Sequence, residues 1–234
     1  MRKKLAIFGF GGHARSVGDL ALACGYQDLL FIEASAQPGE NFLGHVVVRN
    51  VDGFPGQRLH AFAASGDSKT RLAQCSEIAT LGWELVTLVS PSATVGVGSS
   101  IDPGSFIGHH AHVGPMAKIG RGCIVNTGAL VEHEAIVGDY AHISVNSTVA
   151  GRSRVGCHSM VGAGAVVIDR IVVGDGITIG AGSVVVRNVD EQVFMLVRRP
   201  KESNSLSTRH NGLGQRSCGQ QGHGRMTCAA HSTR

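Results

Sequence analysis

Three consecutive residues in the second half of the chain have the types and spacing of a proton-transfer site. His133 stands between Glu132 and Glu134. An imidazole exchanges protons near neutral pH, and a neighbouring carboxylate can orient the ring and stabilise its charged form. Most isolated histidines have only a structural role. The flanking acids and an expected outward position instead favour a general base at His133, with Glu134 as its partner.

His133 belongs to a six-residue repeat that organises much of the chain. Residues 88–189 divide into 17 hexads without an insertion, and the second position is Val or Ile in every one. The sixth position is Ala, Ser or Cys, except at Ile171, Ile177 and Val189. Branched side chains suit a stacked, pleated interior, and small residues leave room beside them. Because a period of six matches neither an α-helix nor a coiled coil, the repeat predicts a β-solenoid.

This repeat resembles the hexapeptide-repeat family, whose fold is a left-handed parallel β-helix with three hexads per coil. The handedness comes from the resemblance alone, since crossover connections are generally right-handed. Seventeen hexads at three per coil make roughly 5.7 coils, stacked at about 4.8 Å each. We therefore expect an all-β, left-handed β-helix in the second part of the protein.

The coil length sets which residues become neighbours. Residues 18 apart stack in consecutive coils, so Gly151 should lie directly beside His133. A glycine there leaves a slot next to the base, and its N–H could stabilise an oxyanion. His142 is nine residues from His133, which is half a coil. The two histidines should project from different parts of the prism, and they can serve one active site only if two subunits contribute to it.

The first part of the chain has the pattern of a βαβ unit. Residues 4–10 read as a buried strand that runs into a glycine-rich turn at the start of an amphipathic helix. Such a turn presents backbone N–H groups and the positive end of the helix dipole to a phosphate. The candidate ligands are Gly11, Gly12 and His13. A tight structural turn is the alternative, because the third glycine of the dinucleotide fingerprint is missing.

A second strand, at residues 29–32, ends at Glu33, an acid at the distance from the turn that suits a ribose hydroxyl. The remaining elements expected before the repeat are strands near residues 45–48 and 60–64, a helix at 68–79 and a strand at 83–89. We therefore expect a Rossmann-like α/β domain at 1–85, the β-helix at 86–193, and a tail at 194–234 whose composition is typical of disorder.

Composition and charge exclude several classes of protein. The chain has 234 residues, 43% of them hydrophobic, and no apolar run approaches the length of about 18 residues that spans a bilayer. The basic N-terminus precedes too short an apolar run for a signal peptide, so we expect a cytoplasmic protein. Residues 198–234 hold seven basic residues and one acid, a charge of +6, against 14 basic and 16 acidic residues elsewhere. Without interleaved aromatics, this basic tail does not indicate nucleic-acid binding.

The cysteines and a histidine cluster give no metal site. Six cysteines show neither metal-ligand nor disulfide spacing, and Cys123, at a small inward position, is expected only to pack. His109, His110 and His112 lie close together without an acid among them. We expect them on a solvated or subunit-facing surface, with metal binding as the minor alternative.

Three motifs narrow the resemblance. Residues 9–14 read G-F-G-G-H-A, and Gly66-Asp67 is followed by Arg71. Residues 126–134 read N-T-G-A-L-V-E-H-E, and residues 142–144 read H-I-S. Together these segments resemble the bacterial UDP-4-amino-sugar N-acetyltransferases and their sialic-acid O-acetyltransferase relatives, over about residues 4–193.

The resemblance implies a reaction, a cosubstrate and an assembly. It implies transfer of an acetyl group from acetyl-CoA to a nucleotide-linked amino sugar for surface glycans, with His133 as base, Glu134 tuning it, and no metal. It also implies a homotrimer in which acetyl-CoA lies between neighbouring β-helices. His142, with Gly151, would then contact acetyl-CoA, and Asn126 the acceptor. The nucleotide sugar would bind at Gly11, Gly12, His13 and Glu33.

Two other functions remain open. One is O-acetylation of a sialic-acid-like sugar, and the other is a non-catalytic hexapeptide scaffold, against which the His133–Glu134 pair argues. The chain also departs from the family after Phe194, where a segment like Gly-Val-Pro-Ala-Lys would help to bind coenzyme A. A frameshift is one explanation of this tail. A genuine tail predicts weaker coenzyme A binding.

Overall fold

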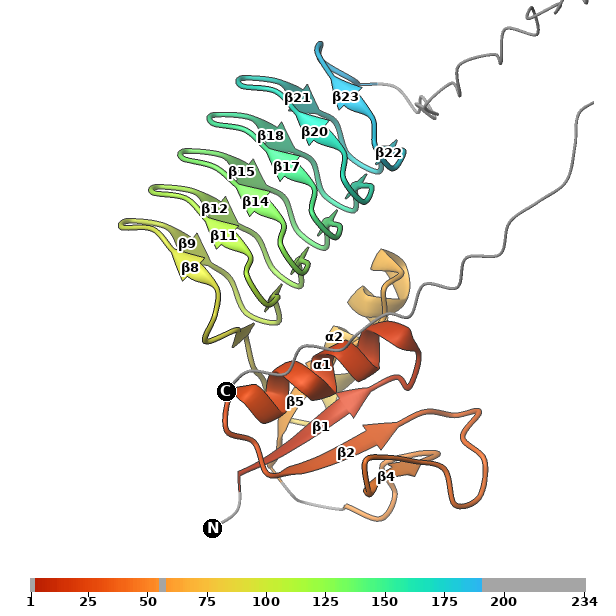
Figure 1. Ribbon diagram of the computed structural model, residues 1–234. Helices are drawn as coiled ribbons and strands as arrows, with labels where there is room; N and C mark the ends of the chain where they lie inside the picture. The colour runs from red at the N-terminus through yellow and green to blue at the C-terminus, as the bar shows by residue number, and fades with distance from the viewer. Residues whose placement is uncertain (1–2, 55–57, 191–234) are drawn as a thin grey trace, which may run out of the picture. The chain divides into compact units, whose positions relative to one another are not determined.

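The computed structural model describes residues 3–54 and 58–190 and has two regions, an α/β sheet and a β-helix (Figure 1). The predictions for residues 194–234, including the departure after Phe194, lie outside the described residues. The first region is a six-stranded sheet in the order β3-β4-β2-β1-β5-β6, and every pairing except β3 with β4 is parallel. Its strands are β1 (Lys4–Phe8), β2 (Asp28–Ile32), β3 (Asn41–Phe42), β4 (His45–Val48), β5 (His60–Ala63) and β6 (Glu84–Leu85).

Alternating side chains of the central strands carry the two helices on opposite faces of this sheet. Leu5 and Ile7 of β1 pack in one cluster with apolar residues of α1 (Gly12–Ala23). Ala6 and Phe8 pack in another with residues of α2 (Ser68–Thr80). Both faces of β1 are therefore buried, as is usual for a parallel strand in the middle of such a sheet. The predicted Rossmann-like arrangement is present.

The strand expected at residues 83–89 is instead two short strands in different sheets. β6 pairs with β5 in the α/β sheet, whereas β7 (Leu88–Val89) pairs with β10 of the β-helix. The chain changes partners between them, because the Val86 N–H donates to Ala61 and the Leu88 N–H to Ser105. The two regions also share core contacts. The boundary after residue 85 therefore stays a prediction.

The second region is the predicted left-handed parallel β-helix. Within residues 88–190 it has 17 strands of two residues each, in three sheets whose partners are 18 residues apart, as in Val113, Val131 and Val149. The first sheet holds β7, β10 (Phe106–Ile107), β13 (Ile124–Val125), β16 (His142–Ile143), β19 (Met160–Val161) and β22 (Thr178–Ile179). The second holds β8 (Thr94–Val95), β11 (His112–Val113), β14 (Leu130–Val131), β17 (Thr148–Val149), β20 (Val166–Val167) and β23 (Val184–Val185). The third holds β9 (Ser100–Ile101), β12 (Lys118–Ile119), β15 (Ile136–Val137), β18 (Arg154–Val155) and β21 (Val172–Val173).

Small polar residues at the sixth hexad position form hydrogen bonds between coils, in addition to leaving room in the interior. The Ser105 hydroxyl donates to the Gly120 carbonyl and accepts from the Cys123 N–H, and Ser159 makes the same pair of bonds farther along the β-helix. Cys123 occupies the equivalent position one coil after Ser105. There its thiol replaces the serine hydroxyl and donates to the Gly138 carbonyl at 3.0 Å. Cys123 therefore joins two coils by a hydrogen bond as well as packing in the interior.

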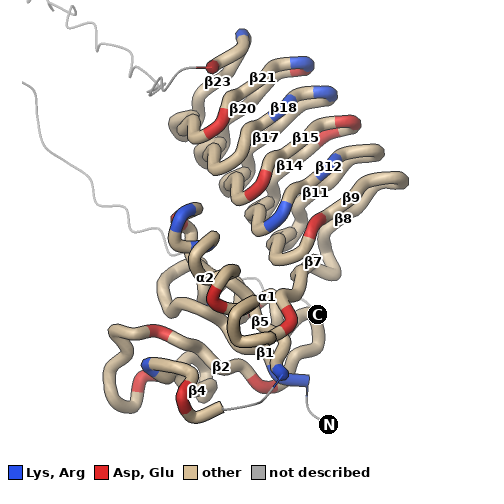
Figure 2. The backbone as a smooth tube through the Cα atoms, turned by 180° about the vertical axis from the view of Figure 1, so that it is seen from behind, with Lys and Arg blue, Asp and Glu red and all other residues tan. Residues whose placement is uncertain are grey.

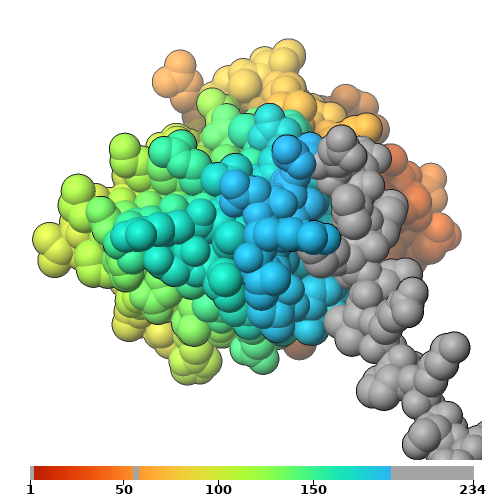
Figure 3. Space-filling view, turned by 90° about the horizontal axis from the view of Figure 1, so that it is seen from above, coloured from red at the N-terminus to blue at the C-terminus, as the bar shows by residue number. Residues whose placement is uncertain are grey.

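The stacked coils, seen from above in Figure 3, carry their charged residues mainly at the corners (Figure 2). Residues at these corners repeatedly have a positive φ, including Met116, Glu134 and Arg152 near 60°. Each is the fifth residue of its hexad, where the chain turns from one sheet to the next. The corner between the second and third sheets, called here the His133 corner, carries His133 and the residues stacked on it.

Candidate active site

The glycine-rich turn forms an open helix N-terminus, as predicted. It follows β1 and leads into α1, with Gly11 as the N-cap residue. Gly9 has a φ of +111°, which disfavours any residue with a side chain. Gly11 and Gly12 are exposed, and a Cβ at either would meet no atom within 4 Å. The first N–H groups of a 12-residue helix are thus accessible to an anion.

This turn lies at the position in the sheet where such folds bind ligands. β2 lies on one side of β1 and β5 on the other, so the strand order reverses next to β1. Ligands in open α/β sheets bind outside the carboxyl ends of the strands at such a reversal. Glu33 follows β2 at the same edge, where its carboxylate accepts hydrogen bonds from the N–H and hydroxyl of Ser35. The predicted substrate residues of the first region therefore share one edge.

His13 brings the turn against the first sheet of the β-helix. Its ring lies 5.0 Å from the ring of Phe106 and 6.4 Å from that of His142, measured between centroids. His142 in turn accepts a hydrogen bond at Nε2 from the Asn126 side-chain amide at 3.3 Å. We call His13, Asn126 and His142 the histidine cluster. The resemblance assigns His142 to acetyl-CoA and Asn126 to the acceptor sugar, and the structure brings both together with His13 within one chain.

Both histidines of the cluster are held in the neutral form. Burial, the neighbouring His142 and the Arg71 charge lower the pKa of His13 to about 3. Burial and Arg71 lower the pKa of His142 to about 4. Rings with such low pKa values accept protons poorly at neutral pH, so they suit hydrogen bonding to a ligand better than proton removal. The Nε2 atom of His13 is buried and has no partner among the described residues.

The His133 corner has the geometry of a base held in one tautomer. His133 Nδ1 lies 3.3 Å from Glu134 Oε2, which as an acceptor assigns the proton to Nδ1. The lone pair of Nε2 then points along the slot left by Gly151, because a Cβ on Gly151 would overlap the ring at Nε2 and Cε1. The His133 side chain is about half exposed, so a substrate can reach it.

Gly151 also offers a backbone N–H group next to His133. No described acceptor takes its N–H, whereas its carbonyl accepts from the Arg170 N–H. A free backbone N–H next to a base is a donor that could stabilise an oxyanion. Above it, Asp169 is held by the Arg152 guanidinium at 3.0 Å. The stacking of Gly151 on His133, predicted from the 18-residue repeat, is confirmed.

The histidine cluster and the His133 corner do not meet within one chain. His142 extends outward from the first sheet, whereas His133 lies at the corner between the second and third sheets. The separation expected from the half-coil offset is therefore present. A single site that uses both groups needs a second subunit.

His109, expected on a solvated or subunit-facing surface, is partly exposed and also contacts its own chain. His109 Nε2 lies 3.2 Å from the Asp19 carboxylate on α1, and its Nδ1 lies 2.8 Å from the Ser90 hydroxyl. His112 is hydrogen-bonded to Thr94 within the second sheet. No group of three or more metal-ligating side chains occurs within residues 3–54 and 58–190. The sequence gives no signal for the contact of His109, because Asp19 is 90 residues away.

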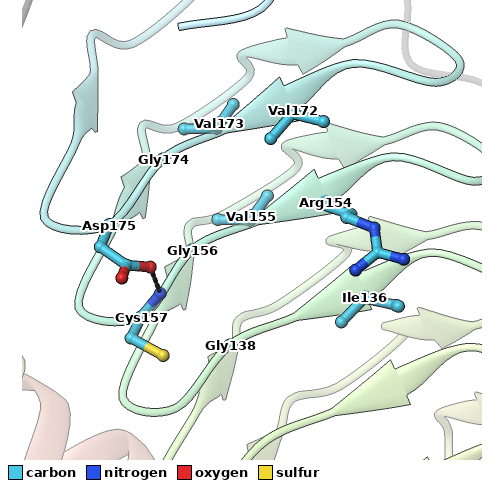
Figure 4. Close-up of a pocket in the computed structure, with 10 residues that line it drawn as sticks. All are labelled: Ile136, Gly138, Arg154, Val155, Gly156, Cys157, Val172, Val173, Gly174 and Asp175. Atoms are coloured by element: carbon cyan, nitrogen blue, oxygen red, sulfur yellow. Dashed lines mark hydrogen bonds between the residues drawn. The ribbon is translucent and has the colours of Figure 1, made fainter. Parts of the chain in front are cut away.

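The third sheet carries a groove of about 360 Å³ that contains none of the predicted site residues (Figure 4). Its floor is formed by the glycines at the third hexad position, including Gly156 and Gly174, where side chains are absent. Arg154 lies to one side, and on the other the Asp175 carboxylate accepts from the Cys157 N–H at 2.7 Å.

None of the described helices is long and apolar enough to cross a membrane.

Comparison with known proteins identifies the family. Residues 4–78 match the PglD N-terminal domain. The acetyltransferase domain of PglB from Neisseria gonorrhoeae is 31% identical, with a TM-score of 0.75 over 82% of this chain and 95% of that one. The chain belongs to the hexapeptide-repeat family of bacterial sugar N-acetyltransferases. Enzymes of this family that resemble it in structure use acetyl-CoA.

Two further family structures contain ligands. The same PglB domain in complex with acetyl coenzyme A is 30% identical, with a TM-score of 0.77 over 83% of this chain and 96% of that one. A mutant of perosamine N-acetyltransferase from Caulobacter crescentus, in complex with CoA and GDP-perosamine, is 30% identical, with a TM-score of 0.74 over 82% and 92% of the two chains. The comparison with curated proteins gave no match.

Proposed function

We propose that this protein transfers the acetyl group of acetyl-CoA to the amine of a nucleotide-linked 4-amino sugar, in the synthesis of a bacterial surface glycan. The observation that carries the acceptor class is the open N-terminus of α1 beside the buried, unpartnered Nε2 of His13. The helix end suits a diphosphate, and the imidazole suits a polar group of the sugar. The complex of the family member with GDP-perosamine supports this assignment.

His133 is the general base of this proposal. As the sugar amine attacks the thioester carbonyl, the nitrogen gains positive charge and the oxygen negative charge. His133 Nε2 takes the proton, while Glu134 stabilises the resulting imidazolium through Nδ1. The Gly151 N–H donates to the oxyanion, and the thiolate of coenzyme A leaves. The low pKa values of His13 and His142 support His133 as the base over either of them.

The proposed assembly is a homotrimer with sites between subunits. The outward first residues of the second sheet include no Asp, Glu, Lys or Arg, whereas those of the third include Lys118 and Arg154. Exposed apolar side chains also gather beside the His133 corner, at Val97, Met116, Ile168 and Val186. Such a patch is typical of a subunit interface. In this arrangement the His133 corner of one subunit faces the histidine cluster of its neighbour, where His142 would contact the acetyl end of acetyl-CoA and Asn126 the acceptor.

The test uses the purified full chain with acetyl-CoA and three acceptors: a UDP-linked 4-amino sugar, a GDP-linked 4-amino sugar and a free sialic-acid-like sugar. Release of the coenzyme A thiol measures turnover, and mass spectrometry locates the acetyl group. We expect turnover with at least one nucleotide-linked amine and an amide product. Turnover with the sugar acid alone would replace this function with O-acetylation. Binding of acetyl-CoA without turnover of any acceptor would favour a scaffold.

We also propose a cytoplasmic location, because acetyl-CoA is a cytoplasmic metabolite in bacteria. Fractionation of cells that make the protein tests this, and recovery in the periplasm would contradict it.

A further inference from the structure

A buried arginine joins the loops of the two regions next to the histidine cluster. Arg71 on α2 has no exposed surface. Its Nη1 donates to the carbonyls of Ser65 and Gly66, in the loop that follows β5, at 2.9 and 3.0 Å. Its Nε donates to the Gly122 carbonyl at 2.7 Å, and its Nη2 to the Tyr140 carbonyl at 2.6 Å, both in the β-helix. The planar guanidinium thus donates hydrogen bonds to four carbonyl groups, two from each region.

Two of these four carbonyls lie in a loop beside the glycine-rich turn, and a third lies two residues before His142. The loop after β5 is adjacent to the glycine-rich turn after β1, because β1 and β5 are paired and the Ala64 N–H donates to the Phe8 carbonyl. In the β-helix, Tyr140 precedes His142 by two residues. Arg71 therefore fixes the turn that presents His13 relative to the strand that presents His142.

The negative charge of Asp67, at the start of α2, favours the charged form of this guanidinium without an ion pair between the two side chains. The hydrogen bonds of Arg71 go to neutral carbonyls, and it forms no ion pair with a described carboxylate. After burial, the Arg71 charge is among the causes that lower the pKa values of His13 and His142. A buried cation is costly unless it is hydrogen-bonded, and the four carbonyls supply those bonds next to the histidine cluster.

We propose that Arg71 is a positioning residue for the nucleotide sugar, setting the separation of His13 and His142 by clamping the loop after β5 to Gly122 and Tyr140. This inference rests on the proposed nucleotide-sugar site. Arg71 touches no substrate itself in this role. Its loss should impair binding of the sugar, which His13 and Asn126 would contact, more than binding of acetyl-CoA, of which His142 would contact only the acetyl end.

The experiment compares Arg71→Met and Arg71→Lys with a matched control, Asp19→Asn. The control weakens the contact of Asp19 with His109, which also joins the first region to the β-helix but includes no side-chain hydrogen bond to His13, Asn126 or His142. For each full-length variant, the KM for the nucleotide sugar, the KM for acetyl-CoA and the thermal unfolding midpoint are measured. Methylguanidinium is added to Arg71→Met to refill the emptied site.

Arg71→Met should raise the KM for the nucleotide sugar by about tenfold or more, the loss expected when a site loses about 1.4 kcal/mol of binding. Arg71→Lys should show a smaller rise, because an ammonium keeps the charge but cannot reach four carbonyls in the same geometry. The KM for acetyl-CoA should rise less than that for the sugar in both, because His142 would contact only the acetyl end of this cosubstrate, and Asp19→Asn should change neither constant. Methylguanidinium should partly restore the sugar KM.

An equal rise in both constants, or the same rise in Asp19→Asn, would reduce Arg71 to a general structural contact and overturn the proposal. So would loss of folding in both Arg71 variants. If the wild-type protein turned over no nucleotide sugar, the proposed function would fail separately. A crystal structure of Arg71→Lys would then still test the positioning role. The His13 and His142 ring centroids should lie farther apart than 6.4 Å, and an unchanged separation would overturn it.

Discussion

At the scale of single residues, the protein separates its two kinds of histidine by environment. His133 lies half-exposed at a corner beside a carboxylate, while His13 and His142 are only partly exposed and lie near a cation. The same side chain can therefore accept a proton at one place and act as a neutral hydrogen-bonding group at the other. This difference leads to two predictions.

Replacement of His133 by Ala should lower kcat by about 10²–10⁴-fold, the usual contribution of a positioned base. Binding of acetyl-CoA, measured by calorimetry, should persist. In the wild-type protein the pH–rate profile should fall on the acid side, because a protonated imidazole cannot accept the proton of the amine. That limb should be absent in His133→Ala. A variant that kept the wild-type kcat and the acid limb would exclude His133 as the base.

The histidine cluster should make folding pH-dependent. Because the folded pKa values of His13 and His142 are about 3 and 4, the unfolded chain, near the ordinary value of 6.5, binds more protons at intermediate pH. Above about pH 6.5 these two rings should not change the free energy of unfolding. As the pH falls from there toward 4, that free energy should decrease. At pH 5 the loss should be on the order of 1–2 kcal/mol per ring.

Urea unfolding at pH 7.5 and pH 5.0 measures this loss. The double variant His13→Asn with His142→Asn serves as the control, since it removes both rings and keeps the other histidines. The wild-type protein should lose more stability than the variant on acidification. Equal losses would mean that these rings titrate in the folded protein much as they do in the unfolded chain.

At the scale of elements, the β-helix depends on small side chains that bond from coil to coil. Ser159 is buried, and its hydroxyl bridges the Gly174 carbonyl and the Ile177 N–H at 2.6 and 2.9 Å. Ser159→Ala should cost about 1–3 kcal/mol of unfolding free energy, because it leaves a buried donor and acceptor unpaired. Ser159→Cys copies the natural arrangement at Cys123 and should recover part of that loss. Denaturant unfolding compares the three proteins, and no cost in Ser159→Ala would contradict the bridging role.

At the scale of the whole molecule, the two halves of the proposed site require different subunits. His133→Ala and His142→Ala should each form inactive or weakly active trimers. Co-expression of the two should then restore activity, because some interfaces combine an intact corner from one chain with an intact cluster from the next. In randomly mixed trimers about a quarter of the sites would be complete. Light scattering should give about three chains per particle. Absence of restored activity in verified mixed trimers would contradict the shared site.

The hexad repeat determined the β-helix from the sequence alone, because every sixth residue in a coil must fill the same interior. It also placed Gly151 beside His133, since 18 residues close one coil. The glycine-rich turn between a buried strand and an amphipathic helix could also be predicted from the sequence, because the periodicities of strands and helices depend only on neighbouring residues. The positions of His133, Glu134 and the turn glycines within their elements therefore follow from the order of the residues.

Contacts between distant segments were decided only by the tertiary structure. The meeting of His13 with His142, the contact of Asp19 with His109 and the clamp of Arg71 on Gly122 and Tyr140 all join residues 51 or more positions apart. No periodicity records such pairs, because they depend on how α1 and α2 pack against the first sheet of the β-helix. The same packing covers much of the two cluster histidines and lowers their pKa values, whereas His133, at a corner away from it, stays accessible to a substrate.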